Sequence, residues 1–202
     1  MLDFFTSVNQ NYLSMSPDEL KENCLIQHPY DVAIFDDFLE QTIFDQVYEE
    51  QSKHIFEFEY IPRDEINIAD LTYLPLLNIA LNGELFLFLE KILDRTFERR
   101  LDQLPQIREF LDNGSKGMGI HNDEQFIGST VVFLYLNDWK NGDGGEIIVY
   151  DKQMNPVHKV KPRQNRLFVI PITNHSFHSV EPIREGYKRR CAYFPLNHYN
   201  KR

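Results

Sequence analysis

Apolar and polar positions along the chain follow two different periods, and the change falls near residue 100. Before it, apolar residues recur every three or four positions, which is the spacing of one helix face. One such pattern follows Asp37, which we predict as the helix cap, and runs to about Lys53. The longest pattern covers residues 75–98 and has a weak point at Asn82-Gly83. The first half is therefore predicted to be helix-rich.

Shorter signals place other elements in the first half. Ser16-Pro17-Asp18-Glu19 predicts a helix start, because proline suits the first turn and acidic side chains stabilise the positive end of a helix. The segment DVAIF at 31–35 is typical of a short strand, and FEFEY at 56–60 alternates as a strand does.

The second half consists of short apolar runs separated by turn residues such as the NGDGG segment at 141–145. Many short strands at this spacing predict a sandwich or barrel, and helices that precede a barrel cover one apolar face of a sheet. We expect one domain over residues 1–202 with a mainly β (α+β) fold. In it, residues 1–100 supply helix-rich support and residues 101–202 form the barrel. The predicted strands are 106–111, 129–136, 145–150, 156–161, 166–171, 178–183 and 189–196.

Composition narrows the class of protein. A chain of 202 residues suits one domain with a single core. The formal net charge of -10 repels a phosphate backbone, which argues against nucleic acid as a partner. Cys24 and Cys191 form no CxxC motif, and the apolar runs are too short or too charged to span a bilayer. We expect a cytoplasmic protein without membrane segments and with reduced thiols.

The motif His121-Asn122-Asp123 is the strongest candidate for chemistry. On a strand, residues i and i+2 point to the same face, about 6.5–7 Å apart along the chain, so one metal ion could be bound by both. His178 opens a later strand-like run and could supply a third ligand. Two histidines and one carboxylate leave other metal positions open, which suits iron(II). An isolated HxD pair is more often a turn or surface pair, but Gly117 and Gly119 flank this one, where bulk would crowd a site.

A basic cluster, Lys188-Arg189-Arg190, enters the last predicted strand. A cation buried at the mouth of a barrel could bind a carboxylate, and arginine does so with two parallel hydrogen bonds. The alternative is a solvated basic loop. Because successive side chains of a strand face opposite ways, Arg189 and Arg190 cannot both point into the same site.

Five segments of the second half stand in the order of a known family. They are REFLDNGSKGMGIHND, VVFLYLNDW, DGGEIIVY, VKPRQNRLFVIP and FHSVEPI. With this ordered set, the chain resembles the prolyl-hydroxylase branch of the iron(II)/2-oxoglutarate-dependent dioxygenases over about residues 105–197. The resemblance implies a double-stranded β-helix, which is a jelly-roll barrel, with the N-terminal helices as its support.

The resemblance also implies a reaction. His121, Asp123 and His178 would bind Fe(II), with 2-oxoglutarate as cosubstrate, O2 as oxidant and ascorbate as a further candidate cofactor. The expected reaction is hydroxylation of a substrate, coupled to oxidative decarboxylation of 2-oxoglutarate to succinate and CO2. Asp123 favours hydroxylation over halogenation, because halogenating relatives carry a small residue in place of the acidic ligand.

Two further site residues follow from the resemblance. Tyr135, in the run Leu134-Tyr135-Leu136-Asn137, is similar to the tyrosine whose hydroxyl binds the cosubstrate carboxylate, and a core aromatic is the alternative. The family places a basic residue nine to twelve positions after the distal histidine. Lys188, Arg189 and Arg190 all fall in this window, and we favour Arg189 for the cosubstrate carboxylate.

Other functions compete with this hypothesis. A cupin-type metal enzyme that does not use 2-oxoglutarate would have more histidines and no basic clamp, and a jelly-roll binding module would have lost turnover. The substrate stays open between a protein side chain, prolyl among them, and a small amino-acid-like molecule, as does the oligomeric state. His175 lies three residues before His178 and is expected in a turn or at the entrance, whereas His28, His54, His158 and His198 have no ligand spacing.

Overall fold

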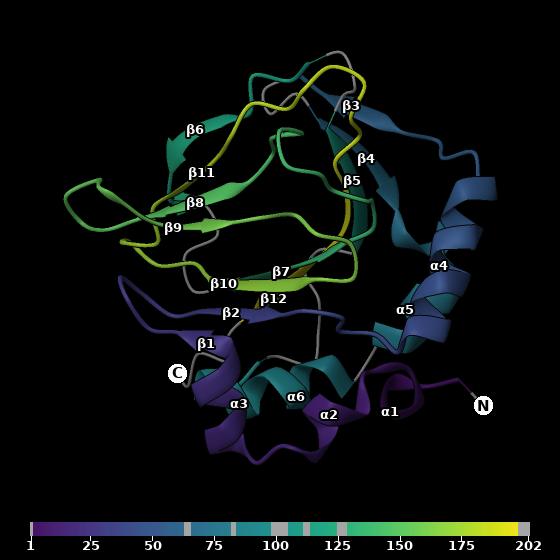
Figure 1. The fold of residues 1–202 in the computed structure, drawn as a ribbon, viewed down its shortest axis with the longest axis horizontal. Helices are drawn as coiled ribbons and strands as arrows, with labels where there is room; N and C mark the ends of the chain where they lie inside the picture. The colour runs from purple at the N-terminus through teal and green to yellow at the C-terminus, as the bar shows by residue number, and fades with distance from the viewer. Residues whose placement is uncertain are drawn as a thin grey trace.

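The structure is a computed structural model that describes residues 2–62, 66–81, 84–97, 105–110, 114–124 and 129–197. Two antiparallel sheets enclose the interior of a barrel, and helices cover the outer face of the larger sheet (Figure 1). The mainly β fold with supporting helices is thus confirmed. In the described part of the chain, no helix is long and apolar enough to cross a membrane.

The smaller sheet has four strands and carries most of the predicted metal site. Its spatial order is β6 (Met118–His121), β11 (His178–Val180), β8 (Ile147–Tyr150) and β9 (Pro156–Val160). The larger sheet has eight strands, in the spatial order β1 (Leu25–Ile26), β2 (Val32–Phe35), β10 (Leu167–Pro171), β7 (Ser129–Tyr135), β12 (Arg190–Asn197), β5 (Gln106–Phe110), β4 (Ile66–Asp70) and β3 (Glu59–Ile61).

The helices come from the first half of the chain and pack mostly beneath the larger sheet in the view of Figure 1, whereas α4 stands at its side. They are α1 (Phe4–Ser7), α2 (Gln10–Ser14), α3 (Pro17–Cys24), α4 (Gln41–Lys53), the 3-10 helix η1 (Leu71–Tyr73), α5 (Pro75–Leu81) and α6 (Glu84–Leu93). Residues 82–83, the weak point predicted in the long helical pattern, lie outside the described residues.

Alternation along β7 explains why the second half has such apolar strands. Val132 and Leu134 pack against the helices, whereas Val131, Phe133 and Tyr135 face the barrel interior. A sheet buried on both faces needs apolar side chains at nearly every position. The runs at 129–136 and 166–171 therefore lack the polar alternation of a half-exposed strand.

Of the two helix starts predicted from local sequence in the first half, one is confirmed and one is wrong. The predicted helix start at Ser16 is confirmed by a capping box, in which the Glu19 amide donates to Ser16 Oγ at 3.3 Å and the Ser16 amide donates to Glu19 Oε2 at 2.8 Å. The predicted cap at Asp37 is wrong. Asp37 has a left-handed φ of 49° in a turn, and α4 begins only at Gln41, with Glu40 in the cap position.

The segment FEFEY forms a strand only at its end, since β3 begins at Glu59. The preceding aromatic side chains have a different partner. The Arg190 guanidinium lies over the ring of Phe56, 4.7 Å from its centroid, and over that of Phe58 at 5.9 Å. A cation over an aromatic face is attracted to it, so Phe56 and Phe58 pack on Arg190 rather than extending the sheet edge.

Candidate active site

His121, Asp123 and His178 meet at one end of the smaller sheet. His121 ends β6 and His178 begins β11, and the two are direct partners in the strand pairing, with ring centroids 4.3 Å apart. Asp123 lies two residues beyond the end of β6 with a left-handed φ of 53°. The predicted proximity of His121 and Asp123 is therefore present, but a turn produces it rather than the pleat of a strand.

The imidazole rings are oriented by the chain itself. His121 Nδ1 lies 2.7 Å from the Gly119 carbonyl oxygen, and His178 Nδ1 lies 2.8 Å from that of Ser176. A carbonyl can only accept, so Nδ1 carries the proton in both rings and the lone pair is on Nε2. Both Nε2 atoms point at Asp123, at 3.7 Å from Oδ1 for His121 and 3.4 Å from Oδ2 for His178.

This donor set fits a divalent metal ion. Ligand atoms about 2.1 Å from a metal and at right angles to each other lie about 3 Å apart, close to the spacing seen between Asp123 and each histidine. Burial opposes ionisation of Asp123, but the neighbouring His178, His121 and Arg108 lower the pKa of its carboxyl below the usual value. The carboxylate is therefore ionised at neutral pH, as a metal ligand must be.

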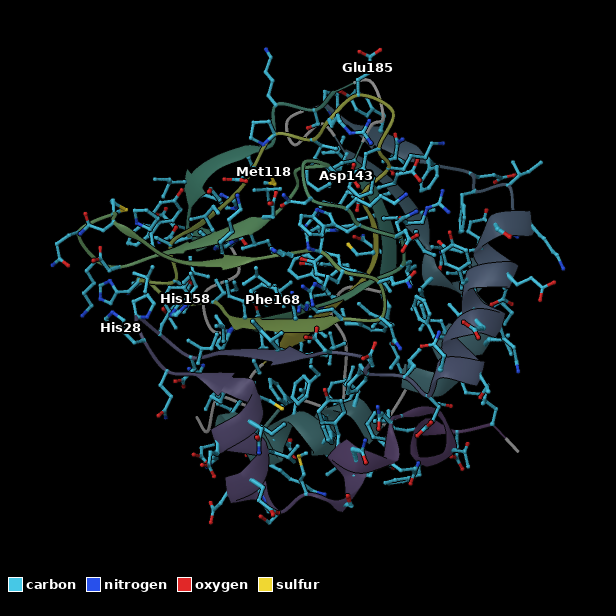
Figure 2. The ribbon with its side chains drawn as sticks, viewed as in Figure 1. His28, Met118, Asp143, His158, Phe168 and Glu185 are labelled. Atoms are coloured by element: carbon cyan, nitrogen blue, oxygen red, sulfur yellow. The ribbon has the colours of Figure 1, made fainter. Side chains whose placement is uncertain are left out.

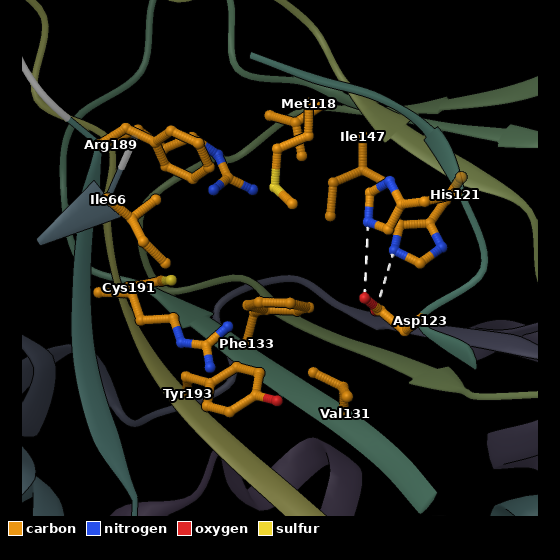
Figure 3. Close-up of a pocket in the computed structure, with 14 residues that line it drawn as sticks. Ile66, Met118, His121, Asp123, Val131, Phe133, Ile147, Arg189, Cys191 and Tyr193 are labelled. Atoms are coloured by element: carbon orange, nitrogen blue, oxygen red, sulfur yellow. Dashed lines mark ion pairs between the residues drawn. The ribbon is translucent and has the colours of Figure 1, made fainter. Parts of the chain in front are cut away.

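The three residues line a cavity of about 130 Å³ inside the barrel (Figure 3). One water molecule needs about 10–15 Å³ of such space, so the cavity has room for a small organic acid. Figure 3 shows His121 and Asp123 on one side of this pocket and Arg189 on the opposite side. Between them the wall is mostly apolar, with Met118, Val131, Phe133 and Ile147 among its residues.

Arg189 forms the polar end of the pocket opposite the triad, and Tyr135 is its hydrogen-bond partner. Arg189 is 2% exposed, and its Nη2 donates to the Tyr135 hydroxyl at 3.1 Å. Among the described residues, none is a hydrogen-bond partner of the buried Arg189 Nε. Burial raises the pKa of Tyr135 to about 12 against the opposing charge of Arg189, so the phenol keeps its proton at neutral pH and can donate it.

Gly145 allows the Arg189 side chain to reach this position. Gly145 has a left-handed φ of 73°, and a Cβ there would lie 2.6 Å from Arg189 Cδ. Any larger residue would push the arginine stem aside. The NGDGG turn thus contributes to the pocket through the close approach of its backbone.

The other two basic residues of the predicted cluster lie elsewhere. Arg190 faces away from the pocket, where Nε donates to Glu109 Oε2 at 2.8 Å, and Lys188 is exposed. The expectation that Arg189 and Arg190 face opposite ways is confirmed. Arg190, which was a second candidate for the cosubstrate carboxylate, does not line the cavity, so its assignment to cosubstrate binding is not supported.

Several pocket residues were not singled out from the sequence. Arg108 and Phe110 come from β5, and Cys191 and Tyr193 come from β12. The alternation in QIREF and RCAYF places each of these pairs on one strand face, because side chains two residues apart point the same way. Without knowing which face is the interior, that pattern does not distinguish pocket from outer surface.

The remaining histidines lie outside the triad. His175 is exposed in the turn before β11, as expected. His28 and His158 lie together at the outer end of the smaller sheet, where His158 Nε2 donates to the His28 carbonyl oxygen at 2.7 Å (Figure 2). His54 packs its ring on Tyr73, with centroids 4.7 Å apart. His198 lies outside the described residues.

Gly117 and Gly119, which flank the HxD motif, have different roles and provide a matched pair of variants. A Cβ on Gly117, which has a φ of 73°, would lie 2.2 Å from the Val180 carbonyl oxygen, whereas a Cβ on Gly119 would meet nothing within 4 Å. We expect Gly117→Ala to lower the free energy of unfolding by at least ~1–3 kcal/mol and Gly119→Ala to change it little. Urea unfolding of both variants measures this, and equal stabilities would contradict it.

Comparisons with known proteins agree with this geometry. The model of the 2OG-Fe(II) oxygenase superfamily matches residues 106–194, which include all three triad residues, Tyr135 and Arg189. A search of curated protein sequences gives no match.

Solved structures share the fold at low sequence identity. A Trichoplax adhaerens prolyl hydroxylase, solved with a peptide of the hypoxia inducible factor oxygen degradation domain, superposes with a TM-score of 0.64 at 18% identity over 95% of this chain and 91% of its own. A 2OG-Fe(II) oxygenase family protein from Burkholderia pseudomallei gives 0.61 at 16% identity over 95% and 90%. A Pseudomonas putida prolyl-4-hydroxylase gives 0.54 at 17% identity over 84% and 88%.

These matches confirm the predicted double-stranded β-helix, and the matched segment carries both the metal-binding donor set and the polar end of the pocket. The group that the family requires is iron(II) with 2-oxoglutarate and O2. Residues 106–194 therefore match the 2OG-Fe(II) oxygenase superfamily, and this match supports a 2-oxoglutarate-dependent dioxygenase.

Proposed function

We propose that His121, Asp123 and His178 hold the iron and that Arg189 and Tyr135 hold the far carboxylate of 2-oxoglutarate, in a hydroxylase. The observation that carries this proposal is the buried Arg189, whose Nε has no hydrogen-bond partner in the described part of the chain and which lies across the cavity from the triad. A buried guanidinium without a carboxylate is unfavourable, so the pocket is built to receive an anion there. When bound, iron(II) supplies the coupled oxidation of 2-oxoglutarate to succinate and CO2 and of a substrate C–H bond to C–OH.

The protein's own residues would bind, orient and exclude water. Arg189 would form charge-assisted hydrogen bonds to the far carboxylate, and the Tyr135 hydroxyl would donate a further one. Met118, Val131 and Ile147 make the wall between this clamp and the triad apolar, which keeps water from the reacting end of the cosubstrate.

The candidate substrates are a protein side chain, with prolyl residues first, or a small amino-acid-like molecule. The prolyl candidate is supported by the names of the two prolyl hydroxylases that share the fold. The net charge of -10 disfavours nucleic acid and mildly favours a basic protein or amino acid. We also propose the cytoplasm as the compartment, because Cys24 and Cys191 are both free thiols, and cell fractionation would check this.

A titration under nitrogen tests the cosubstrate and metal together. Adding 2-oxoglutarate to the iron(II)-loaded protein should produce a metal-to-ligand charge-transfer band, and admitting air should release succinate. Iron binding without the band would favour the cupin-type metal enzyme that does not use 2-oxoglutarate. A protein that binds neither iron nor 2-oxoglutarate would instead be the non-catalytic binding module.

A further inference from the structure

Arg108 is a second cation of the pocket for which the proposed function gives no role. In the strand pairing it stands opposite Cys191 of β12 and Ile68 of β4, and it lines the same cavity as the triad and Arg189. Its guanidinium lies over the Tyr193 ring, 3.3 Å from the centroid, and its Nε donates to Gln106 Oε1 at 3.2 Å. These two contacts of Arg108 are with neutral groups, and its charge also acts on the carboxyl of Asp123.

Arg108 differs from other arginines of the protein in its partners. Arg166, Arg184 and Arg190 each form an ion pair with a carboxylate, from Asp36, Asp143 and Glu109 respectively. Among the residues that the structure describes, no carboxylate forms an ion pair with Arg108. A half-buried guanidinium that forms no ion pair keeps its capacity to bind an anion.

The charge balance of the loaded pocket identifies the missing partner. The formal charges of Asp123, a divalent metal ion, the cosubstrate dianion and Arg189 cancel one another. Arg108 then leaves the pocket with a net positive charge, and an uncompensated charge in a partly desolvated site is unfavourable. A substrate carboxylate would pair with the charge of Arg108. Stacking on Tyr193 uses the face of the guanidinium, whereas a carboxylate binds at its edge.

The position of Arg108 limits what carries that carboxylate. Arg108 and the triad line one cavity, so one compact molecule could place its carboxylate at Arg108 and its reacting C–H bond at the metal. A residue inside a polypeptide has its own carboxyl group bound in a peptide bond. A free amino acid or a similar small acid keeps that group as an anion.

We propose that Arg108 binds the carboxylate of the substrate, and that the substrate is a small amino-acid-like acid rather than a side chain within a polypeptide. This inference rests on the proposed function, because it uses the same metal site. It narrows the substrate class to molecules that carry a carboxylate next to the bond to be hydroxylated.

Matched acids and amides test the proposal in the full chain loaded with iron. The probes are free L-amino acids, starting with proline, their primary amides, and a blocked prolyl peptide. At least one free acid should stimulate 2-oxoglutarate decarboxylation, and its amide should do so roughly tenfold to a hundredfold less, which is the loss expected for a hydrogen-bonded charge. Arg108→Gln should remove the stimulation by the acid to a similar extent. Arg184→Gln, whose arginine lies outside the pocket, should keep the acid-to-amide ratio of the unaltered protein.

A binding measurement distinguishes failure of the Arg108 proposal from failure of the proposed function. With manganese(II) in place of iron, Arg108→Gln should bind 2-oxoglutarate as the unaltered protein does, measured by calorimetry. A weaker Kd for 2-oxoglutarate would assign Arg108 to the cosubstrate and overturn the proposal. So would equal stimulation by acid and amide, stimulation by the blocked peptide alone, or no stimulation by any free acid. Failure of the unaltered protein to bind 2-oxoglutarate with manganese would overturn the proposed function itself.

Discussion

His178→Ala is expected to lower iron-dependent release of succinate from 2-oxoglutarate by more than about 100-fold. The ring supplies one of three donor atoms, and even residues that only orient a metal ligand cost 10–100-fold when replaced. Metal analysis after dialysis against limiting iron(II) should show lower occupancy in the variant. Asp123→Asn should behave alike, because the amide retains the left-handed backbone of Asp123 but is a weaker donor than the carboxylate.

His175→Ala is the matched control for this experiment. His175 is exposed in the turn three residues earlier, and replacing it should leave iron occupancy and succinate release near those of the unaltered protein. Circular dichroism should show the same β-rich spectrum for both variants. If His175→Ala lost activity and His178→Ala kept it, the ligand set would have to be reassigned.

Arg189→Ala is expected to weaken the Kd for 2-oxoglutarate roughly 30-fold or more. Truncating one partner of a buried, hydrogen-bonded charge pair costs ~2–5 kcal/mol, and the lower limit corresponds to this factor. Calorimetric titration of the manganese(II)-loaded protein with 2-oxoglutarate measures the change without depending on turnover.

Arg190→Ala, one position along the chain, should lower the stability of the protein but leave its affinity for 2-oxoglutarate unchanged. It leaves Glu109, which is 5% exposed, without its cation, so the free energy of unfolding should fall by ~3–5 kcal/mol while the Kd for 2-oxoglutarate stays the same. The double variant Arg190→Ala/Glu109→Ala should recover part of that stability. A larger effect of Arg190→Ala than of Arg189→Ala on the Kd for 2-oxoglutarate would mean that the strand faces are assigned in reverse.

The second half of the chain was the more predictable part. Apolar runs such as 129–136 and 166–171 locate β7 and β10 to within one residue at either end. The alternation of side chains also shows that only one of Arg189 and Arg190 can face the interior. Which one does so came from the resemblance to a family, because alternation alone gives two equivalent solutions.

Interactions between distant segments could not be predicted from the sequence. Arg190 lies over Phe56 and Phe58, which an alternating pattern alone would place on a strand. Asp37 occupies a left-handed turn position, although aspartate is also a common helix cap, so its residue type fits both outcomes. Arg108 enters the pocket because β5 pairs with β12, and nothing in QIREF identifies that partner.

Each ligand histidine is held by the carbonyl oxygen two residues before it, and this has a consequence for metal supply. The orientation of both rings is fixed by short chain segments and does not depend on an ion being present, so the site is preformed. Such a set of two imidazoles and one carboxylate also binds manganese, cobalt, nickel and zinc, and affinity for divalent ions generally rises from manganese through iron and cobalt to nickel. We therefore expect the ion that this protein carries in a cell to be decided by the availability of metals there and by the oxidation state of iron, rather than by selection at the site.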